Sequence, residues 1–150
     1  MTAPLTDIEL LRRLLLAAGL GAAIGLEREL RQKSAGLRTN MLIAVGSALF
    51  TLLSVQLAAG TGADVTRITA QIVTGIGFLG AGAILRTRDG VRGLTTAATV
   101  WVNAAVGMAA GGGEYHLALI TTLVTVGVLI VLSPIEAALD RRLFGPRREG

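Results

Sequence analysis

The 150-residue sequence contains no cysteine, three prolines and one histidine, and aromatic residues make up 3% of it. The absence of cysteine excludes a disulfide scaffold and any zinc site built from thiolates. Charged residues make up 16% of the chain, below the roughly 25% that is usual in soluble domains. So few polar side chains cannot cover the surface of an ordinary water-soluble domain, and the length allows one domain.

Hydrophobic residues make up 52% of the chain and gather in five stretches without a charged side chain. A helix needs about 20 residues, within a range of about 17–25, to cross the hydrocarbon layer. Four stretches meet or approach this length, and the first reaches it if its helix starts near Asp7, where Thr6 and Glu9 fit a capping box. The stretches are Leu14–Leu26, Met41–Ala59, Ile68–Leu85, Leu94–Ala110 and Leu117–Leu132.

The sequence therefore predicts an all-α membrane protein, a bundle of five transmembrane helices over residues 1–133. A short basic cytoplasmic tail is expected over 134–150, with Pro134 outside the fifth helix and no soluble C-terminal domain. The alternative for the first stretch is a cleaved signal peptide. That alternative lacks a small-residue cleavage site before Glu27.

Basic residues predict the orientation of the bundle. With five helices, the first loop, the third loop and the C-terminal tail hold 11 of the 14 lysines and arginines. Because basic loops prefer the cytoplasm, the N-terminus should face outward and the C-terminus inward. The excess of basic charge then reflects topology and contact with the lipid bilayer. No nucleic-acid partner is expected, since the chain has few aromatic side chains on which bases could stack.

Ten of the twenty glycines lie inside the uncharged stretches. Small residues let membrane helices approach closely, which predicts tight packing in the bundle or across a homo-oligomer, with a dimer favoured. The alternative is a locally unwound third helix whose free carbonyls line a cavity. The residues concerned are Gly21 and Gly25 in the first helix and Gly75, Gly77, Gly80 and Gly82 in the third.

A weak internal repeat relates the two halves of the chain. A shift of 57 residues places Gly36-Leu37-Arg38-Thr39 on Gly93-Leu94-Thr95-Thr96. Each motif follows a glycine-rich helix and opens the next one. The interpretation is a parallel repeat of two hairpins, followed by one further helix.

Polar side chains at membrane depth are the first candidates for a functional site. Their alternative role is hydrogen bonding within or between helices. Two roles of Asn103 remain open: a structural clamp between helices, or part of a polar path through the membrane. The intramembrane set is Gln71, Thr74, Thr95, Thr99 and Asn103.

A second candidate set is a cytoplasmic charge cluster, which either pairs locally or holds a lipid phosphate or an acidic group of a partner. Its members are Glu27, Arg28, Arg38, Arg86 and Arg92.

The sequence predicts no cofactor and no catalytic residues. No Ser-His-Asp, Cys-His or paired-acid arrangement is present, so an enzyme is not expected. Mg²⁺ prefers carboxylates and retained waters. No carboxylate lies near the middle of any stretch, so bound Mg²⁺ is conceivable but has no support at the midplane, and the metal site is unknown.

Blocks of sequence from Leu14 to Leu132 resemble the MgtC/SapB family of bacterial inner-membrane proteins. The blocks are Gly25-Leu26-Glu27-Arg28-Glu29, Ala35-Gly36-Leu37-Arg38-Thr39, Val45-Gly46-Ser47-Ala48-Leu49-Phe50, Ala70-Gln71-Ile72-Val73, Gly75-Ile76-Gly77-Phe78-Leu79-Gly80-Ala81-Gly82, and Val91-Arg92-Gly93-Leu94-Thr95-Thr96-Ala97-Ala98-Thr99 with Trp101.

The resemblance implies a multi-pass inner-membrane protein with an outward N-terminus, linked to growth in low magnesium, acid stress and, in pathogens, survival inside host cells. It also implies a regulator that restrains the F-type ATP synthase. The competing hypothesis is a channel or transporter for Mg²⁺, another cation or a small solute, with the glycine-rich third helix and the polar fourth helix lining the path.

Overall fold

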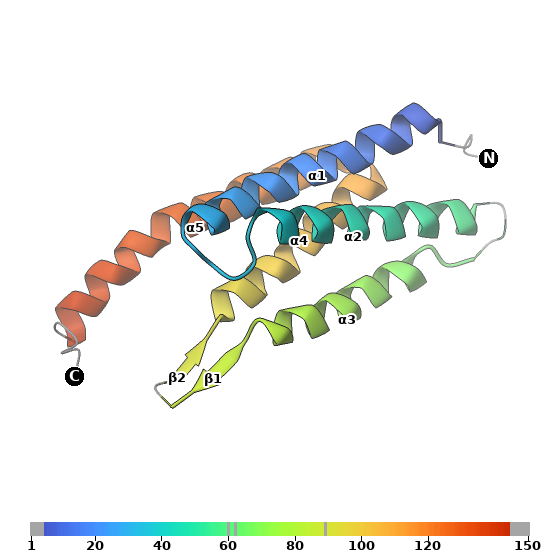
Figure 1. Ribbon diagram of the computed structural model, residues 1–150. Coiled ribbons are helices and arrows are strands. Elements are labelled where there is room, and N and C mark those ends of the chain that lie inside the picture. The colour runs from blue at the N-terminus through green and yellow to red at the C-terminus, as the bar shows by residue number, and fades with distance from the viewer. Residues whose placement is uncertain (1–4, 60, 62, 89, 145–150) are drawn as a thin grey trace.

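A computed structural model describes residues 5–59, 61, 63–88 and 90–144 of the chain. In these residues the structure contains five helices and one two-stranded hairpin (Figure 1). The elements are α1 (Asp7–Leu30), α2 (Leu37–Ala58), α3 (Thr66–Gly82), β1 (Leu85–Thr87), β2 (Gly90–Arg92), α4 (Leu94–Gly112) and α5 (Tyr115–Phe144).

The predicted start of α1 near Asp7 is confirmed, and one of the two hydrogen bonds of the expected capping box is formed. Thr6 is the N-cap, and its hydroxyl accepts a hydrogen bond from the Glu9 N–H at 3.3 Å. Such a cap satisfies one of the N–H groups that have no partner inside the helix. The helix therefore begins among the polar residues that precede the uncharged stretch Leu14–Leu26.

Two details of the expected architecture are wrong. Leu85–Thr87 and Gly90–Arg92 form a short antiparallel hairpin, with Leu85 opposite Arg92, where only helix and loop were expected. Pro134 lies inside α5 and does not mark its end. Proline removes one backbone hydrogen bond, and a helix that still forms the bonds on either side of it tolerates that loss.

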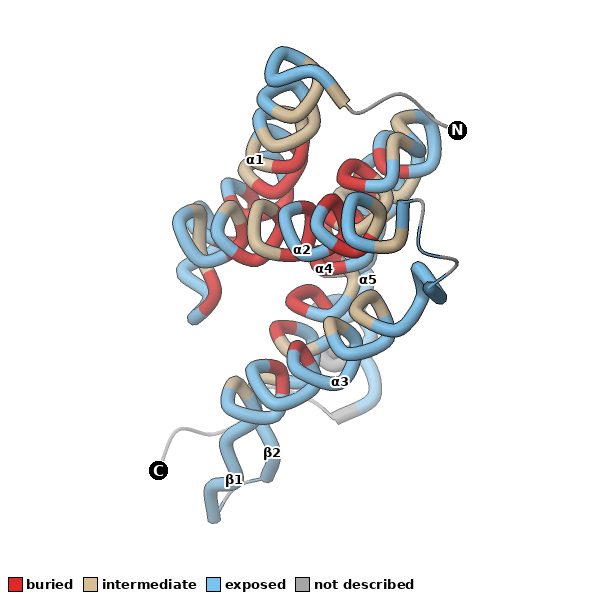
Figure 2. Tube along the Cα trace, turned by 90° about the vertical axis from the view of Figure 1, so that its right-hand side faces the viewer, coloured by how far each residue is buried: buried red, intermediate tan, exposed pale blue. Residues whose placement is uncertain are grey.

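The centre of the molecule is formed by α1, α2 and α4, with α5 against α1 and α4. Figure 2 shows buried residues concentrated on these helices, whereas α3 and the hairpin are mostly exposed. Alanine is the most frequent residue among the buried hydrophobic side chains. The largest group consists of Ala17, Leu20, Ile24, Ala44, Ala48, Val106, Ala110, Ala118 and Leu129.

Small residues bring α2 and α4 close together along a ladder with a four-residue spacing. Gly107 faces the backbone of Ala44, and a Cβ at this glycine would lie 2.9 Å from the Ala44 Cα. Gly111 faces Ala48 in the same way, at 2.8 Å from its Cα. Side chains of any size would hold these backbones apart, so the contact depends on glycine.

The helix α1 approaches α2 from the other side. A Cβ at Gly21 would lie 2.8 Å from the Asn40 carbonyl oxygen, and one at Gly25 would lie 2.8 Å from the Leu37 Cα. Thus α2 is held between two glycine-bearing helices. The helix α3 is continuous through its four glycines. Of these four, only Gly80 faces another helix closely, since a Cβ added there would lie 3.5 Å from the Ala97 carbonyl oxygen.

Gly36 and Gly93 each stand directly before a helix, at the N-cap positions of α2 and α4. Their backbones differ, because Gly36 has φ −84° and Gly93 has φ +88°. A side chain at Gly93 would be strained and would meet the Ala83 carbonyl. The connections differ as well, since a loop joins α1 to α2 and a strand hairpin joins α3 to α4. The parallel repeat stays a prediction.

Candidate functional site

The most elaborate polar structure lies where the end of α1 meets the start of α2 and the middle of α4. Asn103, on α4, donates from its amide to the Asn40 backbone carbonyl on α2 at 2.6 Å. Asn40 in turn donates to the carbonyls of Ala35 and Gly36 at 2.7 and 2.9 Å. Both asparagines are 0% exposed. Together they join α4, α2 and the α1–α2 loop.

The side-chain oxygens of Asn40 and Asn103 are also buried, and neither accepts a hydrogen bond from any described residue. A buried acceptor without a donor costs about 1–3 kcal/mol. A water molecule or a cation can satisfy such an oxygen. The two amides therefore combine a structural clamp with acceptor capacity that the protein itself does not use.

A buried ion network closes the same end of α1. The Glu27 carboxylate contacts the Arg28 Nε at 2.5 Å and the Arg31 Nε at 2.6 Å. Arg31 also donates to the Ser133 hydroxyl on α5 at 2.6 Å. The Glu27 and Arg28 side chains are almost entirely buried. Buried charges persist only when paired, so this network ties the end of α1 to α5.

The neighbouring Glu29 reaches the first turn of α2. Its carboxylate accepts a hydrogen bond from the Leu37 N–H at 3.0 Å. A carboxylate is favoured there because a helix N-terminus carries a partial positive charge. A Cβ at Gly36 would meet the same carboxylate, so glycine at this position keeps the cap in place.

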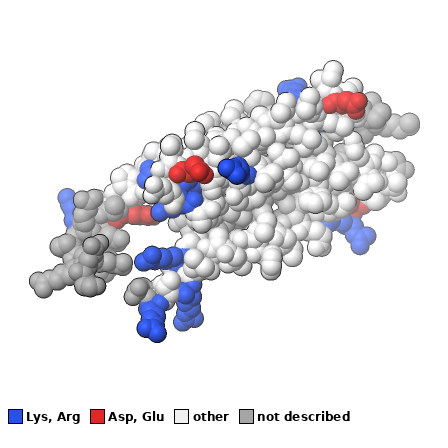
Figure 3. Space-filling view, in the orientation of Figure 1, with Lys and Arg blue, Asp and Glu red and all other residues white. Residues whose placement is uncertain are grey.

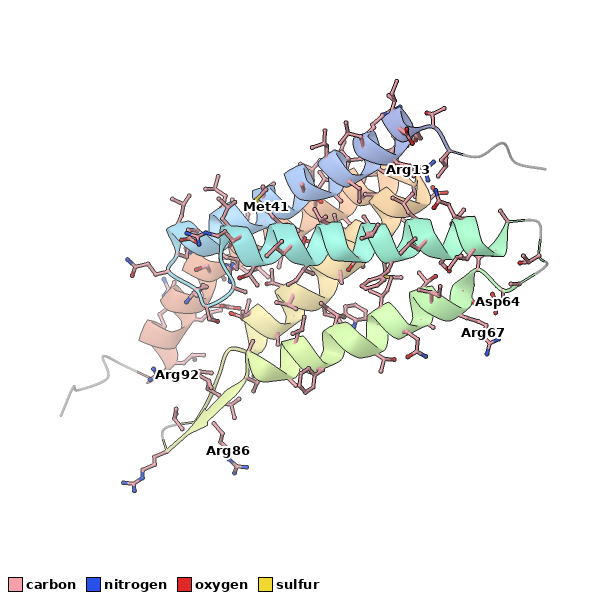
Figure 4. The ribbon with its side chains drawn as sticks, turned by 45° about the vertical axis from the view of Figure 1, so that its right-hand side comes forward. Arg13, Met41, Asp64, Arg67, Arg86 and Arg92 are labelled. Atoms are coloured by element: carbon pink, nitrogen blue, oxygen red, sulfur yellow. The ribbon has the colours of Figure 1, made fainter. Side chains whose placement is uncertain are left out.

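The predicted charge cluster is therefore divided. Glu27 and Arg28 are buried together, whereas Arg38, Arg86 and Arg92 are exposed. The hairpin register pairs Arg86 with Val91 and Arg92 with Leu85, which puts the two arginines on opposite faces of the hairpin. Figure 4 shows both at the hairpin end of the molecule.

The predicted intramembrane set is not gathered into one path. Thr99 and Asn103 are buried on α4, but Thr95 is exposed. The hydroxyls of Thr99 and Thr74 donate to carbonyls of their own helices, at 2.7 and 3.4 Å. Gln71 is exposed and lines a groove between α2 and α3.

At the opposite end of the bundle, a cluster fastens the start of α1 to the α4–α5 turn. Arg13 donates to the Gly111 carbonyl at 2.8 Å and to the Glu9 carboxylate at 3.0 Å. The Tyr115 hydroxyl donates to the same carboxylate, and the guanidinium of Arg12 lies 4.8 Å from the Tyr115 ring centroid. This cluster closes the second end of the bundle.

The same end carries Asp64, in the α2–α3 loop (Figure 4). Its carboxylate accepts hydrogen bonds from the Thr66 N–H at 2.8 Å and from the Thr66 hydroxyl at 2.7 Å. These bonds, with the nearby charge of Arg67, hold the pKa of Asp64 below its usual value.

Sequence reasoning missed Asn40 and the cluster around Arg13. Asn40 stands just before an uncharged stretch, so it escaped the search for polar residues within the stretches. A usable signal was the four-residue spacing of Asn40, Ala44 and Ala48, which repeats the spacing of Asn103, Gly107 and Gly111.

Comparison with known proteins identifies the family of the chain. The sequence profile of the MgtC family matches residues 14–138. The chain belongs to the MgtC family. It is 49% identical over 129 residues to the protein named "Putative magnesium transporter YhiD" of Escherichia coli (strain K12), covering 82% of this chain and 60% of that one.

Two relatives carry the name Protein MgtC. The chain is 48% identical over 121 residues to the one from Brucella abortus (strain 2308), covering 81% of this chain and 50% of that one. It is 50% identical over 119 residues to the one from Salmonella typhimurium, covering 79% and 50%. This MgtC-family chain thus spans about half to three fifths of the length of these relatives. No solved structure matches it.

The MgtC-family chain is a membrane protein. Among the described residues, three helical segments are long and apolar enough to cross a bilayer: Leu37–Ala58, Leu94–Gly112 and Tyr115–Glu136. The helix α1 carries charges at both ends, and α3 has 17 residues. Figure 3 shows charged side chains over the left-hand part of the molecule and at its right-hand end, with an uncharged band between the two groups. Such a band matches the hydrocarbon layer.

Proposed function

We propose that this chain is a five-span protein of the bacterial inner membrane that acts as a regulator related to magnesium. The N-terminus faces outward and the C-terminus inward, as the distribution of basic residues favours. The regulator acts through contacts of its membrane helices with itself or with a partner complex. The relatives named as a magnesium transporter and as MgtC support the magnesium link.

The packed interior supports a regulator more than a carrier. The amide donors of Asn40 and Asn103, at the centre of the bundle, are committed to internal hydrogen bonds with backbone carbonyls. Backbone contacts such as Gly107 against Ala44 leave no room for a hydrated ion between α2 and α4. Solute transport needs a hydrophilic path, which a single chain would have to open by separating these helices.

The observation that carries the proposal is the outward surface of α3. Phe78 is 81% exposed, and Leu79 and Val73 are 55% and 42% exposed. Only Ile76 and Gly80 of this helix are buried. An apolar helix held on one side alone offers a broad surface to a helix of a second copy or of another membrane protein. The resemblance implies the F-type ATP synthase as that partner.

Transport of Mg²⁺ is the second candidate, favoured by one observation. The unpaired side-chain oxygens of Asn40 and Asn103 are buried in the same clamp between α2 and α4. Amide oxygens are ligands that hard cations accept. Mg²⁺ that crossed the membrane by way of these two oxygens would pass along α4.

Flux measurements on the purified chain in sealed vesicles separate the two candidates. The regulator predicts no Mg²⁺ or proton flux above that of empty vesicles. If a flux is found and Asn103→Leu abolishes it without disturbing assembly, the regulator proposal is wrong.

A partner assay tests the regulator directly. Inverted membrane vesicles that contain an F-type ATP synthase are prepared with and without the chain, and ATP-driven proton pumping is followed. The chain should reduce pumping, and Phe78→Ala should relieve the reduction. Leu123→Ala is the matched control, because Leu123 is 63% exposed on α5. Equal effects of the two variants, or no effect of the chain, would count against a contact through α3.

A further inference from the structure

A groove of about 800 Å³ runs between α2 and α3, with Val100 of α4 among its lining residues. Its lining is almost entirely apolar, and α2 contributes Leu42, Ile43 and Phe50. Several of these side chains, including Phe50 and Leu79, are also exposed on the outside of the molecule. The groove therefore opens sideways, toward the hydrocarbon layer in which the helices lie.

The groove has the length of an acyl chain in one leaflet. On α3 its lining runs from Ile68 to Gly82, and on α2 from Thr39 to Phe50. At a rise of 1.5 Å per residue, these segments are roughly 21 Å and 17 Å long. Half of the hydrocarbon layer is about 15 Å thick. A lipid tail that enters at one interface can therefore lie along the groove to the midplane.

The two ends of the groove differ in charge. At the hairpin end, Arg38 lies one helical turn before Leu42, which lines the groove. Ala83 also lines it, and the hairpin that carries Arg86 and Arg92 begins two residues later. The three arginines are exposed. Figure 4 shows Arg86 and Arg92 at this end.

At the other end of the groove, the single arginine beside Ile68 is accompanied by an acid. This residue, Arg67, is close enough to Asp64 for its charge to lower the pKa of that carboxyl. The excess of positive charge is therefore at the hairpin end.

We propose that this groove is a binding site for an anionic phospholipid, with an acyl chain between α2 and α3 and the headgroup phosphate on Arg38 and Arg86 at the hairpin end. The apolar walls match the tail, and the guanidinium groups match the phosphate. The site does not depend on the regulator proposal, because it needs neither a partner protein nor a flux.

The test uses the intact chain in nanodiscs that contain equal amounts of phosphatidylglycerol and phosphatidylcholine. Lipids that stay bound after release from the nanodisc are counted by native mass spectrometry. Wild type should retain phosphatidylglycerol in preference to phosphatidylcholine. Each arginine removed from the headgroup site should weaken that preference about fivefold, so a double variant should weaken it about 25-fold. The variant is Arg38→Gln with Arg86→Gln, and Arg67→Gln is its control at the other end.

The tail site is tested by filling the groove. Gly75 lines the groove and a Cβ there meets nothing within 4 Å, so Gly75→Leu places a side chain in the groove without striking the backbone. Bound lipid should be lost. Gly77→Leu is the matched control on the same helix, because Gly77 is equally open but does not line the groove. Gly46→Leu, from the α2 side, is an independent second blocker.

Three results would overturn the proposal. Gly75→Leu and Gly46→Leu could retain as much lipid as wild type. Gly75→Leu and Gly77→Leu could lose lipid equally, which would point to a general effect on α3. Gly75→Leu could change the oligomeric mass and leave lipid retention unchanged, which would make the groove a contact between copies of the chain.

Discussion

The contact between Gly107 and Ala44 gives the sharpest test of the bundle, through Gly107→Ala. The added methyl group would lie 2.9 Å from both the Ala44 Cα and its carbonyl carbon, and nearer still to the carbonyl oxygen. These are backbone atoms, so no side-chain rotation relieves the contact. Carbon atoms prefer separations of about 3.5–4.0 Å, and α2 and α4 must therefore part locally by roughly 0.6 Å.

The expected loss of stability follows from three contributions. Overpacking of a tight contact costs about 1–3 kcal/mol. Separation of the helices also stretches the hydrogen bond of Asn103 to the Asn40 carbonyl, one turn away, and such bonds in membranes contribute about 0.6 kcal/mol on average. Alanine restores up to ~1 kcal/mol of helix propensity. The net expectation is a destabilisation of about 1–2 kcal/mol.

Gly127→Ala is the control for helix propensity. Gly127 lies in α5, and a Cβ there meets nothing within 4 Å, so alanine should leave stability unchanged or raise it by up to ~1 kcal/mol. Unfolding in mixed micelles, followed by the fluorescence of Trp101, the single tryptophan, measures both variants. If Gly107→Ala is as stable as Gly127→Ala, the backbone contact between α2 and α4 is refuted.

Three further predictions concern topology, the buried charges and pH. The chain has no cysteine, so in intact cells an impermeant thiol reagent should label Ala63→Cys and spare Thr87→Cys; the reverse pattern would invert the proposed orientation. Glu27→Gln leaves Arg28 buried without its carboxylate, and unfolding should show a loss of about 3–5 kcal/mol; a loss below 1 kcal/mol would contradict the buried pair. The Asp64 carboxyl has its pKa lowered by folding, so its small contribution is present above the unfolded pKa and lost as pH falls through the folded one. NMR titration should place its midpoint below 3.8, and a midpoint above that value would contradict the hydrogen bonds.

The helices could be predicted from the sequence because a helix that lies in lipid has to satisfy a simple requirement. A helix must be apolar over a set length, and capping residues mark where it leaves the membrane. This reasoning located the start of α1 correctly at Thr6. It failed at Pro134, because the rule that proline ends a helix is only a tendency. Here α5 continues past Pro134 despite the lost backbone hydrogen bond. The hairpin at Leu85–Arg92 was missed since three-residue strands leave no periodic signal.

The candidate site was only partly predictable, because burial of charge is a tertiary property. Glu27 and Arg28 look like ordinary interfacial charges in the sequence, but α2 and α5 both pack against their end of α1, with Ser133 of α5 beside Arg31. The role of Asn40 depends on Asn103, which is 63 residues away. A spacing rule within one helix cannot identify a partner on another helix.

The helices α1, α2 and α4 are packed tightly, whereas α3 is packed loosely at their edge, and this difference bears on function. The helices α1, α2 and α4 meet through backbone contacts that tolerate no added methyl group, whereas most glycines of α3 have open space around them. A bundle of this kind has little freedom to open between α2 and α4. It has more freedom to move α3, which touches α4 near Gly80. A ligand or partner that changes the state of this protein should therefore act on α3, the groove beside it and the arginine-bearing hairpin that follows it.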